Sequence, residues 1–148
     1  MKITFLRHCR SIFNELLYSD KDCDLSVKGV EQAKALQGDY DIVICSVMRR
    51  ARRTLELSKI RSGSIEYTDL CREWRNDICD FLDHENEQNN RETPEELGIR
   101  IQKFCEWIKG KYERSGKRIL VVTHADFVYK LTNEAKYLEN GEFFEYDV

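Results

Sequence analysis

The segment Ile119-Leu120-Val121-Val122-Thr123-His124 holds four consecutive apolar residues and ends on two polar ones. A short run that is apolar at every position is typical of a strand buried on both faces of a parallel sheet. Asp41-Ile42-Val43-Ile44-Cys45 has the same character, and Lys2–Leu6 is a third short run rich in β-forming residues. Helical patterns lie between these runs, and such alternation favours a parallel sheet covered by helices. The sequence therefore predicts an α/β fold, a three-layer α/β/α sandwich with a mostly parallel central sheet.

The clearest helix begins at Thr93-Pro94-Glu95-Glu96. Thr93 caps its amino end, Pro94 takes the first helical position, and Glu96 closes a capping box. Apolar residues recur at helical spacing as far as Tyr112, and Gly116 supplies a left-handed stop. The remaining predicted elements are helices over 26–37, 51–60 and 127–133, strands over 65–67 and 143–146, and a polar loop over 76–92.

Length and composition limit the class of protein. A chain of 148 residues suits one hydrophobic core, so we expect a single domain over residues 1–148. Apolar residues make up 41% of it, and seven glycines with one proline are too few for a disordered chain. The net charge of −3 gives no general attraction to nucleic acid. No apolar run approaches the ~20 residues of a membrane helix or resembles a signal peptide. We therefore expect a cytoplasmic protein that binds neither nucleic acid nor membranes.

Cysteine and histidine spacing gives no indication of a metal site. The six cysteines contain no CxxC pair, which favours free thiols in a reducing compartment. His84-Glu85-Asn86-Glu87 is not the HExxH pattern of a zinc enzyme. The sequence thus predicts neither a metal ion nor another cofactor.

Two of the three histidines stand directly after predicted strands. His8 follows Lys2–Leu6 and Arg7, and His124 follows Val121-Val122-Thr123. Ligands of open α/β sheets bind beyond the carboxyl ends of the strands, so both imidazoles are expected to face one crevice. The alternative is that each histidine is an ordinary core or surface residue. Matching positions after two strands favour the functional interpretation.

Arginines accompany these histidines. Arg7 precedes His8, and Arg50 follows the second buried strand after a short turn. A guanidinium binds phosphate oxygens in a bidentate way, so this grouping indicates a bound phosphoryl group, with Asn14 as a further neutral donor. The alternative for the basic cluster Met48–Arg53 is a solvated helix face that touches nucleic acid. Helical periodicity lets only one or two of its four arginines point inward.

The stretch Arg7-His8-Cys9-Arg10-Ser11-Ile12-Phe13-Asn14 resembles the RHGxSxxN signature of the histidine phosphatase superfamily, which has the phosphoglycerate mutase-like fold. Further segments resemble motifs of that family in the same order along the chain. They are Leu25–Ala33 (L[ST]xxGxxQA), Ser46–Thr54 (SxxxRAxxT), Leu70–Glu73 (LxxE) and Val121–His124 (VVxHG).

The resemblance implies a phosphatase mechanism without a metal. Neutral His8 would attack phosphorus and carry the phosphoryl group on nitrogen. Protonated Glu73 would donate to the leaving oxygen, and its ionised form would then activate water against the phosphohistidine. Burial or the charge of the phosphate would have to raise the pKa of Glu73. The residues implied to hold the phosphate oxygens are Arg7, Asn14, Arg50 and His124, with Ala125 at the glycine position after the second histidine.

The sequence departs from the family pattern at several positions. Cys9 and Ala125 replace glycines by small residues, and we interpret Cys9 as a packing residue rather than a second nucleophile. Arg10 replaces a common glutamate. If it reaches the crevice it favours substrates with a second anionic group, and otherwise it lies on the loop surface. Asp126 is interpreted as a cap of the following helix rather than a partner of His124.

The segment after Glu73 lacks the glycines that are frequent in the family. The position of the proton donor is therefore weakly constrained, and Asp77 or Asp80 are the alternatives.

Together these patterns favour a phosphatase that hydrolyses a phosphomonoester, either a small metabolite or a phosphoprotein, through a phosphohistidine on His8. The chain lacks the length of the insertions associated with phosphoglycerate mutases, so mutase-type phosphoryl transfer is the second enzymatic interpretation. A non-catalytic phospho-ligand-binding protein on the same fold is the alternative from another class. The sequence specifies neither the substrate nor the oligomeric state.

Overall fold

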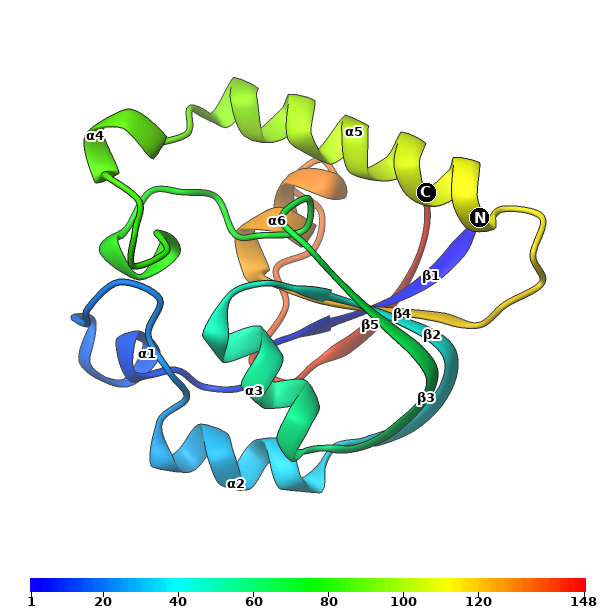
Figure 1. Cartoon of the computed structure of the whole chain (residues 1–148), viewed down its shortest axis with the longest axis horizontal. Helices are drawn as coiled ribbons and strands as arrows, with labels where there is room; N and C mark the ends of the chain where they lie inside the picture. The colour runs from blue at the N-terminus through cyan, green and yellow to red at the C-terminus, as the bar shows by residue number, and fades with distance from the viewer.

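The structure is a computed structural model that describes all of residues 1–148, built on a five-stranded sheet in the order β3-β2-β4-β1-β5. Helices cover both faces of this sheet (Figure 1). The arrangement confirms the predicted α/β fold with a mostly parallel sheet. Four strands pair in parallel, β1 (Lys2–Arg7), β2 (Gln37–Ser46), β3 (Lys59–Thr68) and β4 (Ile119–Thr123), whereas β5 (Phe143–Asp147) runs antiparallel to β1.

The hydrophobic core lies on the two faces of the sheet. Phe5 and Val121 belong to the layer under α5 and α6, whereas Leu6 and Val122 belong to the layer under α3, beside which α2 packs. Successive residues of β1 and β4 therefore enter opposite apolar layers, which is why these strands are apolar at consecutive positions. None of the helices is both long and apolar enough to cross a membrane. The bounds are α2 (Val27–Ala35), α3 (Arg49–Leu57), α5 (Pro94–Tyr112) and α6 (Ala125–Leu131).

Several predicted boundaries are correct and others are wrong. Helix α5 begins with the predicted capping box, in which Thr93 Oγ1 accepts from the Glu96 amide at 3.1 Å. The helix predicted over 51–60 instead ends at Leu57, because β3 begins two residues later at Lys59. Strand β3 is longer than predicted, since its backbone pairs with β2 along its length although its side chains are mostly polar.

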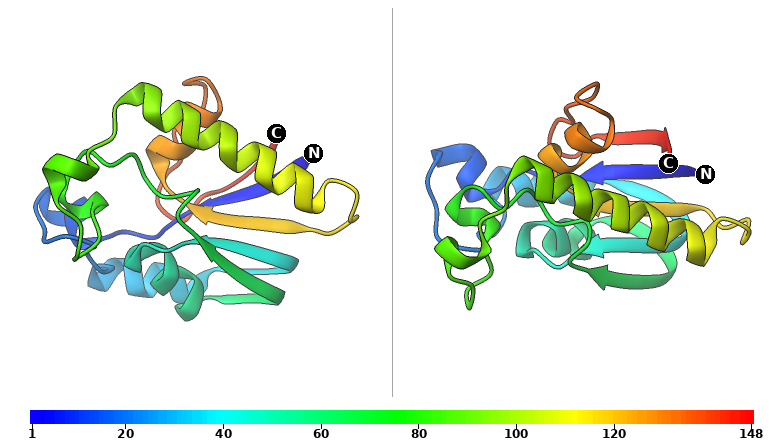
Figure 2. Two further views of the ribbon diagram at one scale, coloured as in Figure 1. Left: turned by 45° about the horizontal axis from the view of Figure 1, so that its top comes forward. Right: turned by 90° about the horizontal axis from the view of Figure 1, so that it is seen from above.

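Short elements gather beyond the carboxyl ends of β1, β2 and β4, at one side of the molecule (Figures 1 and 2). The sequence did not predict α1 (Ile12–Leu16), a 3-10 helix (Ile78–Asp80) or α4 (Glu87–Asn90). The last two interrupt the stretch 76–92 that was predicted as a loop. This side of the molecule holds the candidate site.

Candidate active site

His8 follows β1 directly, and its imidazole is almost completely buried. The ring atom Nδ1 lies 2.7 Å from the carbonyl oxygen of Cys9, so Nδ1 carries the proton and donates it there. Nε2 then holds the lone pair, which accepts a long hydrogen bond of 3.4 Å from Nε of Arg50. Burial, followed by the charges of Arg50 and Arg7, lowers the pKa of His8 well below its usual value. The imidazole is therefore neutral at physiological pH, with its basic lone pair on Nε2.

The two imidazoles predicted to share a crevice lie side by side. Strands β1 and β4 are parallel neighbours in which Arg7 pairs with Thr123. The residues that follow, His8 and His124, consequently share one register, and their ring centroids are 5.1 Å apart. Nε2 of His124 lies 2.8 Å from Ser46 Oγ, whereas Nδ1 is buried without a hydrogen-bond partner. Burial is the main cause that lowers the pKa of His124 well below its usual value, so both rings are neutral.

Arg50 lies in the first turn of α3, and its guanidinium points into the protein. Its Nη1 donates to the carbonyl of Cys79 at 2.8 Å, and Nη2 donates to Oδ1 of Asp80 at 2.9 Å. Both side chains of this ion pair are buried. Asp80 thus pairs with the arginine that the family resemblance assigns to phosphate.

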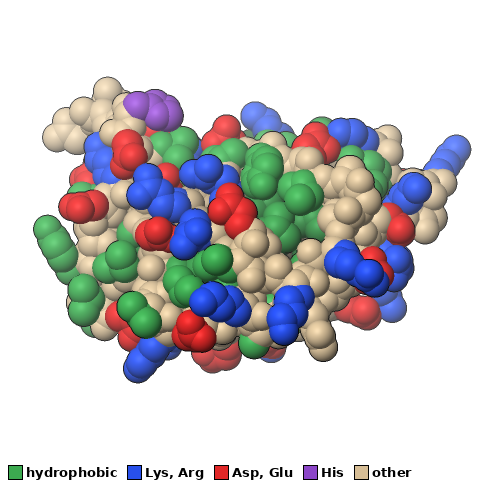
Figure 3. Space-filling model, turned by 60° about the horizontal axis from the view of Figure 1, so that its bottom comes forward, with side chains coloured by type: hydrophobic (Ala, Val, Ile, Leu, Met, Phe, Trp, Pro, Cys, Tyr) green, Lys and Arg blue, Asp and Glu red, His purple; other side chains and the backbone are tan.

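The other arginines of the basic cluster face outward. Arg49 lies 3.7 Å from a carboxylate oxygen of Asp83, and Arg53 lies 3.4 Å from one of Asp24. On the face of the molecule drawn in Figure 3, basic and acidic side chains are interspersed. Of the four arginines of the cluster only Arg50 is buried, in agreement with helical periodicity.

Arg7 and Asn14 each keep donors that the protein itself does not use. Nη1 of Arg7 donates to the Leu138 carbonyl at 2.8 Å and the guanidinium lies 5.5 Å from the Tyr137 ring centroid, but Nε is buried without a partner. Oδ1 of Asn14 accepts from the amide and hydroxyl of Ser11 at 3.0 and 2.9 Å. The amide nitrogen of Asn14 is therefore the end that remains for a ligand.

The Glu73 carboxyl forms the wall of the site near α6. Oε1 accepts from the amides of Trp74 and Phe127 at 3.0 and 2.9 Å, and Oε2 accepts from the amide of Asp126 at 3.1 Å. Two of these amides belong to the first turn of α6, so Glu73 caps that helix from outside. The interpretation of Asp126 as the cap is therefore wrong. Burial, followed by the charges of Asp126 and Asp80, raises the pKa of Glu73 to about 8.

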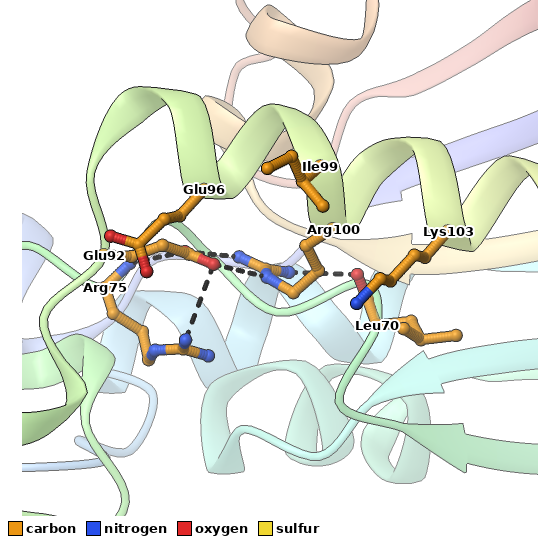
Figure 4. Close-up of a pocket in the computed structure, with 7 residues that line it drawn as sticks. All are labelled: Leu70, Arg75, Glu92, Glu96, Ile99, Arg100 and Lys103. Carbon is orange, nitrogen blue, oxygen red and sulfur yellow. Dashed lines mark hydrogen bonds and ion pairs between the residues drawn. The ribbon is translucent and has the colours of Figure 1, made fainter.

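Arg100 of α5 holds the backbone that carries Glu73. Its Nη1 donates to the carbonyls of Leu70 and Arg72 at 2.9 and 2.8 Å, and its Nη2 donates to the Glu73 carbonyl at 3.1 Å. The buried carboxylate of Glu92 accepts two hydrogen bonds of 2.8 Å from the same guanidinium (Figure 4). Because every member of this network is paired, it fixes the position of Glu73. No pattern in the polar stretch 76–92, which includes Glu92, predicts this network.

Helix α2 supports the loop that follows His8. The Ser26 amide donates to the Arg10 carbonyl at 3.0 Å, and Gln32 Oε1 accepts from the Arg10 amide at 3.1 Å. A Cβ atom at Gly29 would lie 1.9 Å from the same carbonyl oxygen, so only glycine allows this approach. Gly29 and Gln32 of the Leu25–Ala33 motif thus position the backbone of the motif that begins at Arg7.

Cys9 is a packing residue, as predicted. Its side chain is completely buried in a small cluster with Leu25 and Ala33. Burial raises the pKa of its thiol to about 11, so it is not a thiolate at neutral pH.

Three predicted site residues, Arg10, His124 and Ala125, do not line the cavity. Nε of Arg10 lies 2.6 Å from Oε1 of Glu15, and this ion pair holds the guanidinium on the outer side of the loop. His124 is completely buried beside His8. Ala125 is buried as the first residue of α6, where only its backbone is suited to meet a ligand. Direct roles for all three residues stay predictions.

The site as a whole is a cavity of about 100 Å³ at the carboxyl ends of β1 and β2. The predicted residues that line it are Arg7, His8, Asn14, Arg50 and Glu73. Sequence reasoning assigned no site role to Ser11, Phe13, Cys79 or Tyr137, which also line it. The one sequence feature near Tyr137 that predicts a turn is the pair Asn140-Gly141, and Gly141 has a φ of +75°. This feature did not identify Tyr137 as a residue of the site.

Comparison with known proteins identifies a family and a group of similar folds. The family model of the histidine phosphatase superfamily (branch 1) matches residues 3–148. A candidate alpha-ribazole-5'-phosphate phosphatase of Escherichia coli is similar in structure, with 19% identity, a TM-score of 0.72 and coverage of 100% of this chain and 91% of that one. A phosphoserine phosphatase of Entamoeba histolytica in complex with phosphoserine has 15% identity, a TM-score of 0.65 and coverage of 97% and 89%. A mycobacterial glucosyl-3-phosphoglycerate phosphatase in complex with VO3 has 15% identity, a TM-score of 0.67 and coverage of 97% and 90%.

These structural likenesses confirm the predicted fold. The family match extends over nearly the whole chain and includes each of the segments whose motifs pointed to phosphoryl chemistry. The chain belongs to the histidine phosphatase superfamily.

Proposed function

We propose that the protein is a phosphatase that hydrolyses a small phosphomonoester through a phosphohistidine on Nε2 of His8. The observation that carries this proposal is the state of that imidazole. It is buried and neutral, its Nδ1–H is held by the Cys9 carbonyl, and its Nε2 faces Arg50 beside the cavity. A fixed tautomer whose Nε2 lone pair is held only by a long hydrogen bond, next to a cation, suits attack on a phosphate ester.

In the first step, Nε2 of His8 forms a bond to phosphorus while the ester oxygen–phosphorus bond breaks. Glu73 supplies the proton that the leaving oxygen takes up. Oε1 of Glu73 already accepts two hydrogen bonds, whereas Oε2 accepts one, so Oε2 is the oxygen with capacity to carry the proton.

In the second step, ionised Glu73 takes a proton from water while the water oxygen bonds to phosphorus. The nitrogen–phosphorus bond breaks, which returns neutral His8, protonated Glu73 and inorganic phosphate. The sum of both steps is hydrolysis of the ester to an alcohol.

The phosphoryl oxygens would be bound by donor groups that the fold already holds in place. Arg7 and Arg50 supply guanidinium donors, and Asn14 supplies an amide donor. His124 lies beside His8, with its buried Nδ1 lacking a protein partner. Preorganised donors of this kind are the main source of catalysis in phosphoryl transfer.

The size of the cavity supports a small substrate. Its volume of about 100 Å³ is below the roughly 300–1,000 Å³ of sites for drug-sized ligands. A phosphoryl group and a short leaving group fit this space better than a large metabolite.

The test is a screen of phosphorylated metabolites, nucleotides and phosphopeptides with wild-type protein and His8→Ala. We expect release of inorganic phosphate that depends on His8. Rapid quenching should also trap an acid-labile, base-stable phosphoprotein. Binding without turnover of any ester would instead support the non-catalytic alternative.

A further inference from the structure

We propose that the substrate carries a positively charged group on the alcohol side of its phosphate ester, and that the Asp126 carboxylate binds that group. This inference rests on the phosphatase function proposed above and names the class of its substrate. It follows from the balance of charges in the cavity.

The cavity contains more acidic than basic side chains. Two guanidiniums, Arg7 and Arg50, face four carboxyl groups, Glu73, Asp77, Asp80 and Asp126. A phosphate ester brings further negative charge, so a substrate with an acidic tail meets repulsion from several sides. Glu73 is mostly protonated at neutral pH, which leaves three other carboxyl groups against two guanidiniums.

Two of the four carboxyl groups have protein partners that explain them. Glu73 accepts hydrogen bonds from the first turn of α6. Asp80 pairs with Arg50 through Oδ1, and its Oδ2 accepts from the amide of Asp77 at 2.9 Å. These contacts position the proton donor and neutralise the buried guanidinium.

Asp126 has no such explanation. Its half-buried side chain forms neither an ion pair nor a hydrogen bond, although it sits in the first turn of α6. Lys130 follows it by one helical turn and lines a neighbouring depression with it, but the two side chains form no ion pair. Burial and the charges of Asp80 and Asp77 raise the pKa of Asp126, whereas the charge of Arg7 lowers it. Asp126 thus has no ion-pair partner in the protein, and a cation bound against it would stabilise its charged form.

A second observation indicates that the same cavity binds an anion. Arg7 is 8% exposed, and its buried Nε has no partner in the protein. A buried guanidinium donor left free in this way points to an anionic ligand. The cavity thus offers the donors of Arg7, Arg50 and Asn14 to an anion and the unpaired carboxyl group of Asp126 to a cation. A ligand with a phosphate and an ammonium group matches both.

The acidic side chains do not form a metal site. No three histidine, cysteine or acidic side chains of the chain converge in a way that could hold a metal ion. An organic cation on the substrate is therefore the occupant that suits Asp126. Because the cavity is small, the cation must lie within a few bonds of the phosphate.

The experiment compares three esters that differ only at one end. Phosphoethanolamine ends in an ammonium group, propyl phosphate replaces that group by a methyl group of similar size, and 3-phosphooxypropionic acid ends in a carboxylate. In wild-type protein we expect kcat/KM to decrease in that order, with phosphoethanolamine preferred over propyl phosphate by roughly tenfold or more. Asp126→Asn should bring the ratio of these two values close to one. The ratio cancels general changes in the catalytic step, because both esters meet the same variant.

Asp39→Asn is the matched control. It removes one negative charge from the exposed partner of Arg61, outside the cavity, and should leave the wild-type ratio in place. Equal kcat/KM for phosphoethanolamine and propyl phosphate in wild type, or an unchanged ratio in Asp126→Asn, would overturn the assignment. Hydrolysis of p-nitrophenyl phosphate reports on the phosphatase function itself. If that ester and all three others are inert, the proposed function fails and this inference fails with it.

Discussion

Raising the pH through about 8 should selectively slow the hydrolysis of esters with poor leaving groups, because Glu73 then loses its proton. Burial and the charges of Asp126 and Asp80 raise the pKa of this carboxyl from 4.5 to about 8. With that value about nine-tenths of the molecules carry the proton at pH 7 and about one-tenth at pH 9. An unperturbed glutamate would be protonated in well under 1% of molecules at pH 7, so the raised pKa is what makes Glu73 usable as an acid.

The assay is kcat/KM measured from pH 6 to 10 with propyl phosphate and with p-nitrophenyl phosphate, because this quantity reports the pKa of the free protein. Loss of a general acid costs about 10²–10⁴-fold in rate, so kcat/KM for the alkyl ester should fall about tenfold per pH unit above 8. Nitrophenolate leaves without protonation, so its ester should show a much shallower decrease. Glu73→Gln should remove the alkaline limb for propyl phosphate and lower its plateau. Identical limbs for the two esters, or a limb that persists in Glu73→Gln, would refute this role.

The raised pKa of Glu73 also predicts how the free energy of unfolding changes with pH. A carboxyl whose pKa is higher in the folded than in the unfolded chain binds its proton more tightly when folded. The stabilisation that Glu73 gains from this tighter proton binding is therefore fully present below about pH 4.5 and is lost as the pH rises towards 8. Relative to Glu73→Gln, the wild-type free energy of unfolding should decrease by at most roughly 1.4 kcal/mol per pH unit in this window. Parallel pH profiles of the two proteins in urea unfolding would contradict the raised pKa.

Other substitutions test the remaining parts of the site. His8→Ala should abolish both turnover and the acid-labile phosphoprotein label, and label that persists in this variant would exclude His8 as the nucleophile. Asp80→Asn should lower the free energy of unfolding by about 3–5 kcal/mol, because Arg50 loses its buried partner, and it should tighten inhibition by inorganic phosphate. Unchanged phosphate inhibition would show that Asp80 does not compete for Arg50. Gly29→Ala should lower the Tm strongly through its clash with the backbone after β1, whereas Gly110→Ala, with open space around its Cβ position, should be neutral or stabilising.

The positions of the two histidines could be predicted because they depend on local signals and one topological rule. The apolar runs before His8 and His124 mark buried strands, and the carboxyl ends of parallel strands meet at one edge. Helical periodicity limited the inward-pointing arginines to one or two of four, and the family resemblance selected Arg50. In the structure the two rings neighbour each other and the Arg50 guanidinium is buried, although His124 does not line the cavity.

The acidic side of the cavity could not be predicted, since it depends on contacts between distant segments. Asp80 reaches Arg50 only because the polar stretch 76–92 folds back over the site. That stretch is held by Glu92 and Arg100, whose pairing lacks any periodic pattern in the sequence. Likewise, Asp126 resembles an ordinary helix cap until Glu73 is seen to occupy that position. Polar residues in irregular segments acquire their roles from tertiary contacts, which no local rule encodes.

The buried pair of Arg50 and Asp80 explains how a phosphate site can exist in the folded protein before phosphate binds. A guanidinium this deeply buried needs an anionic partner, since an unpaired buried charge costs several kcal/mol. Asp80 supplies that partner, and an entering phosphate replaces one carboxylate charge by two charges on the ester. The binding energy at Arg50 is therefore the difference between two ion pairs rather than the full strength of one. A carboxylate ligand gains little binding energy from such an exchange, whereas a dianionic phosphoryl group gains the attraction between Arg50 and its second negative charge. Because His8 and His124 are neutral, the arginines alone supply positive charge, so we expect the proposed site to favour a dianionic phosphoryl group over a carboxylate.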